Sequence, residues 1–80
     1  MYLHLGGTVI INTAELIAVE NLEGKASLEN WLQRQQKTGK EVVDIAEGRP
    51  KSAIYTDQRI ILSPISSLTL RKRLEQGSIK

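Results

Sequence analysis

The sequence predicts an α+β fold, a small and mostly antiparallel β domain with two helices. Two observations lead to this prediction. Short runs of Val, Ile, Leu and Tyr are separated by glycine- and asparagine-containing turn signals, which is typical of antiparallel strands. Two longer segments place apolar residues three or four positions apart and are each followed by glycine, which is typical of amphipathic helices.

The chain is expected to form one domain, residues 1–80, with an aliphatic core. Of its 80 residues, 23 are Ile, Leu or Val, while Phe and Cys are absent. This apolar content is enough for folding, although so small a domain without disulfides often gains stability by oligomerising. No run is long enough to span a membrane and no basic stretch precedes an apolar core at the N-terminus, so we expect a cytoplasmic protein.

The N-terminal elements begin with a predicted hairpin. Tyr2–Leu5 and Thr8–Ile11 are strand-like runs, and the glycine pair between them can adopt the positive φ angles of a tight turn. A helical turn at Asn12–Leu16, capped by Asn12 or Thr13, and a strand at Ile17–Asn21 are predicted to follow.

The clearest predicted helix is Leu28–Thr38, which begins after a capping Ser27 and ends before Gly39. Its apolar residues lie at positions i, i+3 and i+4 and include Trp31. We therefore expect Trp31 to anchor the helix to the core.

The C-terminal half is predicted to contain three strands and a second helix. Glu41–Ala46 and Ser52–Thr56 are expected to form a hairpin around residues 48–51, and Arg59–Ser63 is a further strand. The second helix, Ser66–Gly77, is expected to be capped by Ser66 or Ser67 and to bury Leu70 and Leu74 on one face. Three cations, Arg71, Lys72 and Arg73, lie in the half of this helix where the helix dipole favours positive charge.

Charge is divided unevenly along the chain. Residues 1–47 carry four basic and seven acidic residues, a net charge of −3, whereas residues 48–80 carry seven basic and two acidic residues, a net charge of +5. Such a division indicates a face for an acidic partner, two faces that pair between subunits, or chance clustering on solvated surfaces.

Nothing in the sequence indicates an enzyme, a metal site or a cofactor site. His4 is the only histidine and there is no cysteine, which disfavours both zinc binding and catalysis by a Ser-His or Cys-His pair. No glycine-rich phosphate-binding loop is present. We expect no catalytic residue, no cofactor and no small-molecule substrate.

The loop Arg49-Pro50-Lys51 is the feature best suited to binding. Proline restricts its own φ and the backbone of Arg49, so the loop has less freedom to lose on binding. Arginine offers a planar fork to phosphate oxygens, and lysine a flexible positive charge. The same composition also suits a solubilising turn, and the chemistry alone leaves both interpretations open.

Three stretches resemble the extracellular matrix regulatory proteins of the RemA/RemB type: residues 1–7 (MYLHLGG), 9–19 (VIINTAELIAV) and 47–74 (EGRPKSAIYTDQRIILSPISSLTLRKRL). The opening and the ending are most similar to the RemB branch. The resemblance implies a cytoplasmic, DNA-binding regulator of biofilm matrix genes with a fold akin to the LytTR domain. It also implies a homo-oligomeric ring around which double-stranded DNA wraps.

The resemblance carries over to individual residues only in part. Arg49 matches the first arginine of the family's DNA-contacting loop, but the next arginine is replaced by Pro50, and Lys51 takes over part of that charge. A further contacting arginine of the family aligns near Ala14. The expected DNA-binding residues are Arg49, Lys51, Arg71, Lys72 and Arg73. The alternative is a ring-forming protein-interaction module that has lost strong DNA binding.

Overall fold

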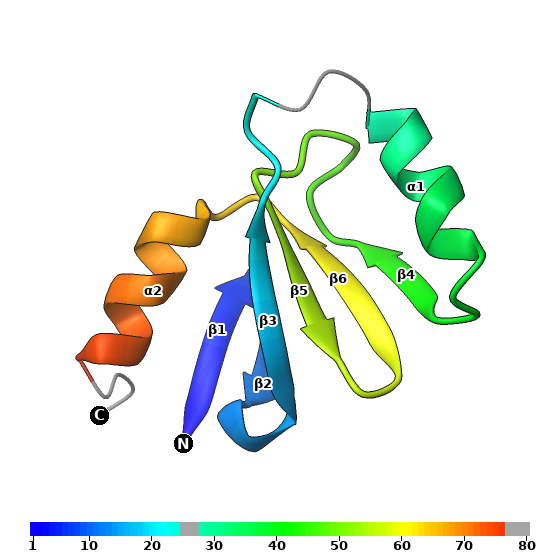
Figure 1. Ribbon diagram of the computed structural model, residues 1–80. Coiled ribbons are helices and arrows are strands. Elements are labelled where there is room, and N and C mark those ends of the chain that lie inside the picture. Colours follow the sequence, from blue (N-terminus) through cyan, green and yellow to red (C-terminus); the bar gives the residue numbers. More distant parts are fainter. Residues whose placement is uncertain (25–27, 77–80) are drawn as a thin grey trace.

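A computed structural model describes residues 1–24 and 28–76, and it confirms a small α+β architecture with mostly antiparallel strands (Figure 1). In chain order the strands are β1 (Tyr2–Gly6), β2 (Val9–Asn12), β3 (Leu16–Asn21), β4 (Glu41–Asp44), β5 (Ser52–Thr56) and β6 (Arg59–Ser63). A 3₁₀ turn, η1 (Thr13–Glu15), precedes β3, and the two helices are α1 (Leu28–Gln36) and α2 (Ser67–Glu75). The elements agree with the predicted ones except for shifts of one or two residues at their ends.

The local signals act as predicted where the structure describes them. β1 and β2 form the expected antiparallel hairpin. The Asn12 side chain caps η1, and the Ser66 side chain caps α2 by accepting a hydrogen bond from the Thr69 amide. The predicted Ser27 cap and the glycine after α2 lie outside the described residues.

The prediction that β4 and β5 form a hairpin is wrong. The larger sheet has the order β3-β5-β6-β4, so β6 lies between the two strands that the sequence order suggested would pair. β4 pairs parallel with β6, and the other strand pairs of the structure are antiparallel. The loop 45–51 therefore crosses the end of β6 rather than closing a hairpin.

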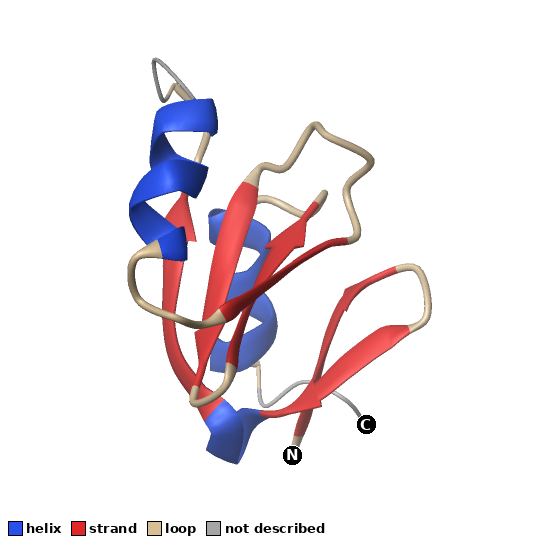
Figure 2. Cartoon of the chain, turned by 90° about the vertical axis from the view of Figure 1, so that its right-hand side faces the viewer, coloured by secondary structure: helices blue, strands red, loops and turns tan. Residues whose placement is uncertain are grey.

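Each face of this sheet has its own apolar cluster, because side chains alternate along the strands. Trp31 of α1 is 1% exposed and packs on one face with Leu22, Ala53, Ile60 and Leu62, which confirms its predicted role as a core anchor. The β1–β2 hairpin and α2 cover the other face. The buried residues of this second cluster, from the covering elements and from the sheet, are Leu3, Leu5, Ile11, Ile54, Ile61 and Leu70. Figure 2 shows α1 and α2 on opposite sides of the sheet, with the hairpin extending away from it.

Buried serines attach the outer elements to the sheet. The Ser63 hydroxyl donates to the Leu5 carbonyl oxygen and accepts a hydrogen bond from the Ile65 amide. The Ser52 hydroxyl donates to the Ile65 carbonyl oxygen at 2.7 Å. These bonds fix the start of α2 beside the end of the sheet at which loop 45–51 crosses.

Candidate nucleic-acid interface

The loop that carries Arg49 and Lys51 is attached to the sheet at both ends. The Ile45 amide donates to the Leu62 carbonyl oxygen at 3.0 Å, and the Lys51 amide donates to the Ser63 carbonyl oxygen at 2.8 Å. The Lys51 carbonyl oxygen in turn accepts a hydrogen bond from the Leu22 amide at 3.0 Å. The backbone of Lys51 is thus fixed from two sides.

Within the loop, the Asp44 carboxylate organises a tight turn. Its two oxygens accept hydrogen bonds from the amides of Ala46, at 2.7 Å, and Gly48, at 2.9 Å. Glu47 and Gly48 both have positive φ, 55° and 82°, and the Arg49 amide donates to the Ala46 carbonyl oxygen at 3.1 Å. Two successive residues with positive φ, flanked by two residues whose backbones are hydrogen-bonded to each other, are the pattern of a type I′ turn.

The role of Asp44 was not predicted from the sequence. The signal was available, because an aspartate side chain commonly bonds to backbone amides a few residues ahead, and a glycine follows at the position that needs positive φ. It was overlooked because the segment was assigned to a strand that continued to Ala46.

The cationic side chains of the loop remain available. Arg49 and Lys51 are both exposed, and within residues 1–24 and 28–76 neither side chain has a hydrogen-bond or ion-pair partner. Glu47 is exposed on the same loop. The Asp44 and Glu47 carboxylates therefore offset part of the positive potential that Arg49 and Lys51 create.

The structure does not align the three cations of α2 with one another. Successive helical residues are turned by about 100° from each other, so Arg71, Lys72 and Arg73 point in three directions. Arg71 lines a groove between α2 and β3, and Lys72 is exposed. Arg73 is half-buried and donates from Nη1 to the His4 carbonyl oxygen at 3.0 Å, which joins α2 to β1.

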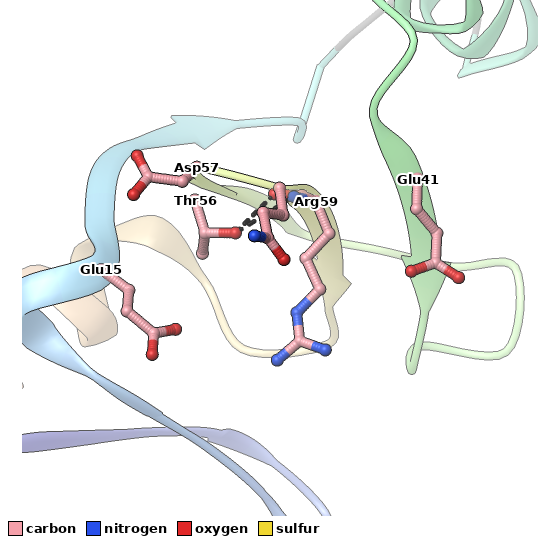
Figure 3. Close-up of a pocket in the computed structure, with 6 residues that line it drawn as sticks. Glu15, Glu41, Thr56, Asp57 and Arg59 are labelled. Atoms are coloured by element: carbon pink, nitrogen blue, oxygen red, sulfur yellow. Dashed lines mark hydrogen bonds between the residues drawn. The ribbon is translucent and has the colours of Figure 1, made fainter.

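The opposite end of the sheet carries a polar pocket of about 480 Å³ lined by Glu15, Glu41, Thr56, Asp57, Gln58 and Arg59. Figure 3 shows the Arg59 side chain extending between Glu15 and Glu41, while the Asp57 carboxylate points away from it. The Thr56 hydroxyl donates to the Arg59 carbonyl oxygen and accepts from its amide. A second cation lies nearby, because Lys40 Nζ donates to the Thr56 carbonyl oxygen at 3.0 Å. Among the residues that the structure describes, the three carboxylates therefore outnumber the cations at this end by one.

Ala14, the position nearest to another DNA-contacting arginine of the resembled family, lies in η1 at this acidic end. It is next to Glu15 and far along β3 from the end at which loop 45–51 crosses. This position therefore holds a neutral side chain close to the carboxylates of the pocket.

A half-buried polar cluster lies between α1 and the sheet. The Glu20 carboxylate accepts hydrogen bonds from Trp31 Nε1 at 3.1 Å and from the Tyr55 hydroxyl at 2.5 Å. Burial and the adjacent Glu20 carboxylate raise the pKa of the Tyr55 phenol from 10.0 to about 12. The cluster orients the Trp31 ring.

The described residues offer no site for a metal ion, since they contain no group of three or more His, Cys, Asp or Glu side chains suitably placed to bind one. His4, the one histidine, has Nε2 2.7 Å from the Gly7 carbonyl oxygen and so helps to close the β1–β2 turn. In the part of the chain that the structure describes, no helix is long and apolar enough to cross a membrane.

Comparison with known proteins identifies a single family. The family model described as "Extracellular matrix regulatory protein A-like" (RemA-like) matches residues 2–74. The chain is also 35% identical over 77 residues to extracellular matrix regulatory protein B of Bacillus subtilis (strain 168). That alignment covers 94% of this chain and 91% of the relative.

Proposed function

The chain belongs to the RemA-like family of extracellular matrix regulatory proteins, and we propose that it regulates biofilm matrix gene expression by binding double-stranded DNA. In this proposal Arg49 and Lys51 contact the phosphate backbone. The observation that carries the proposal is the loop itself, which is hydrogen-bonded at both ends and by Asp44 while its two cations remain exposed.

The chemistry of the loop suits backbone contacts rather than base recognition. The backbone of the loop is already ordered, so binding costs little further backbone entropy. Arg49 can present its guanidinium fork to two phosphate oxygens, and Lys51 adds a second charge. Contacts of this kind position a protein on DNA but carry no direct sequence information.

A ring-shaped homo-oligomer with a LytTR-like fold is a further part of the proposal. A closed ring requires head-to-tail contacts between two different surfaces of each subunit. Repeating the loop around a rim would multiply weak phosphate contacts, because each later contact becomes effectively intramolecular. A DNA-binding role also places the protein in the cytoplasm.

The test is a titration of duplex DNA with the parent protein and with Arg49→Ala, at two salt concentrations. Arg49→Ala should weaken binding about tenfold or more, since it removes one contact from every subunit. Arg59→Ala is the matched control, because Arg59 is an exposed arginine at the opposite end of the same sheet. Native mass, measured for all three proteins, should stay unchanged.

Equal affinity of Arg49→Ala and the parent would contradict the proposal. It would favour the second candidate, a protein-interaction module that has lost strong DNA binding. One observation supports that candidate: the loop region carries Asp44 and Glu47 beside its two cations, and Pro50 stands where the family has a second arginine. Duplex binding by the parent that is undetectable even at low salt would establish that alternative over DNA binding.

A further inference from the structure

One edge of the larger sheet is open. β3 is the first strand in the order β3-β5-β6-β4, and no strand within residues 1–24 and 28–76 pairs with its other side. The Leu22 amide donates to the Lys51 carbonyl oxygen, so the backbone polar groups of Leu22 face β5. In an antiparallel ladder every second residue faces its partner strand in this way, so the backbone amide and carbonyl of Glu20 face β5 as well. The backbone amides and carbonyls of Val19 and Asn21 therefore point outward, toward the open edge.

The β3 edge (LIAVEN) lacks lysine and proline, two residues that often protect such strands from pairing. Ile17, at the irregularity between Leu16 and Ala18, is 58% exposed on this strand. Ile17 adds apolar surface to this edge.

A groove of about 270 Å³ lies directly beside this edge, between β3 and α2. β3 contributes Leu16, Val19 and Asn21, and α2 contributes Ser67, Arg71 and Leu74. The three helical residues follow the i, i+4, i+7 spacing of a single face. The groove thus combines an aliphatic floor with one cation, and no carboxylate from residues 1–24 or 28–76 lines it.

We propose that the β3 edge and this groove bind an extended acidic segment of a protein partner, which adds to the sheet as a further strand. The outward backbone groups of Val19 and Asn21 would pair with the segment, and the groove would hold an aliphatic side chain from it. Arg71 is exposed, and within the described residues its side chain has no hydrogen-bond or ion-pair partner, so it can bind a carboxylate of the segment.

The occupant is a peptide rather than a nucleic acid, because a duplex offers no backbone amide and carbonyl row to pair with a strand. Its acidic character follows from charge complementarity with Arg71 in a groove that has no carboxylate in its lining. The inference is independent of the DNA-binding proposal, which uses Arg49 and Lys51 at the end of the sheet and does not use Arg71.

The experiment uses the full chain and a fluorescent, end-blocked hexapeptide, Thr-Asp-Thr-Val-Thr-Asp, with binding followed by anisotropy. Its valine and its two aspartates lie on one face of the extended peptide, so both kinds of side chain can face the groove. Arg71→Glu should weaken binding about tenfold or more, because it replaces attraction by repulsion inside the groove. Lys72→Glu is the matched control: it makes the same charge change on the next residue, which is exposed and does not line the groove. It should leave the affinity within about threefold of the parent value.

Two further peptides test strand addition itself. N-methylation of every second residue removes the backbone N–H donors along one edge of an extended peptide. Methylation of the odd-numbered residues and methylation of the even-numbered residues therefore remove the donors of opposite edges. One set should abolish binding and the other should not. Equal effects of both sets, equal losses with Arg71→Glu and Lys72→Glu, or no binding to the parent would each overturn the proposal. A fall in native mass on addition of the peptide would overturn it as well, because a second copy would then occupy the edge.

Discussion

The Asp44 carboxylate spans the tight turn before Arg49 by accepting hydrogen bonds from the Ala46 and Gly48 amides. A negative charge so close to the proposed phosphate contact opposes DNA binding electrostatically. The same group also holds the backbone that directs Arg49. The two effects have opposite signs, so a substitution at this residue shows which is larger.

We predict that Asp44→Ala weakens duplex binding, although it makes the protein more positive. Two amides lose their acceptor, the turn loosens, and Arg49 must be ordered at the moment of binding. Stability should fall by about 1–2 kcal/mol for the same reason. Duplex titration and chemical denaturation measure the two effects.

Glu47→Gln is the control for Asp44→Ala, since it removes an exposed negative charge from the same loop without removing any of these amide bonds. It should leave duplex affinity equal or slightly stronger. Tighter binding by Asp44→Ala than by the parent would show that charge, not loop order, limits the contact.

Burial and the Glu20 carboxylate raise the pKa of the Tyr55 phenol to about 12. The unfolded chain loses this proton near pH 10, whereas the folded chain keeps it until about pH 12. The contribution of Tyr55 to stability is therefore complete below pH 10 and is lost as the pH rises from 10 to about 12.

We predict that Tyr55 in a Tyr2→Phe background titrates near pH 12 and that Glu20→Gln in the same background lowers that midpoint. The Glu20 charge disfavours the phenolate, so its removal eases ionisation. Tyrosinate absorbance, followed against pH, measures both midpoints. A Tyr55 midpoint near 10 would mean that the hydrogen bond to Glu20 does not persist in solution.

At the scale of elements, α2 presents its three adjacent cations to three different surroundings. Arg73 joins the helix to β1 through the His4 carbonyl oxygen, and Arg71 faces the groove beside β3. Lys72 is exposed. The sequence run RKR is therefore not a single basic patch, because helical rotation separates residues that are adjacent in the chain.

We predict that Arg73→Ala lowers the unfolding free energy by about 1–2 kcal/mol, since it removes a charged hydrogen bond and the packing of the arginine stem between α2 and β1. Lys72→Ala should change it by less than about 0.5 kcal/mol. Denaturant titration of both variants measures the difference. Equal stabilities would show that Arg73 does not hold the two elements together.

At the scale of the whole molecule, each end of the sheet carries charges of both signs. Arg49 and Lys51 lie beside Asp44 and Glu47 at one end, and Glu15, Glu41 and Asp57 lie near Arg59 and Lys40 at the other. A single protomer offers two loop cations to DNA, which is few for stable duplex binding at physiological salt. Strong binding therefore requires several protomers to act on one duplex.

We predict that duplex affinity falls steeply with salt, with a log–log slope well beyond that of two contacts, since each neutralised phosphate contributes about −0.9. A slope near −2 would indicate binding by isolated protomers. The measurement is a set of duplex titrations across salt concentrations, with native mass determined at each one. Strong discrimination between unrelated duplexes at high salt would contradict backbone contact as the main source of affinity.

The sequence by itself determined the features that depend on neighbours in the chain. The β1–β2 turn, the Asn12 and Ser66 caps and the burial of Trp31 and Leu70 were predicted correctly, because each follows from side-chain periodicity or from a side chain bonding to a nearby amide. The exposure of Arg49 and Lys51 follows in the same way from a polar loop between apolar strands.

Only the tertiary structure decided which strands pair and what each cation contacts. The sequence order favoured a hairpin between β4 and β5, but β6 fills the space between them, since strand pairing depends on every strand that competes for the same edge. Arg73 obtains its partner from β1, which lies at the other end of the chain, and no local pattern encodes a contact between residues so far apart. The open β3 edge beside Arg71 arises for the same reason, because an edge exists only once the whole sheet has assembled.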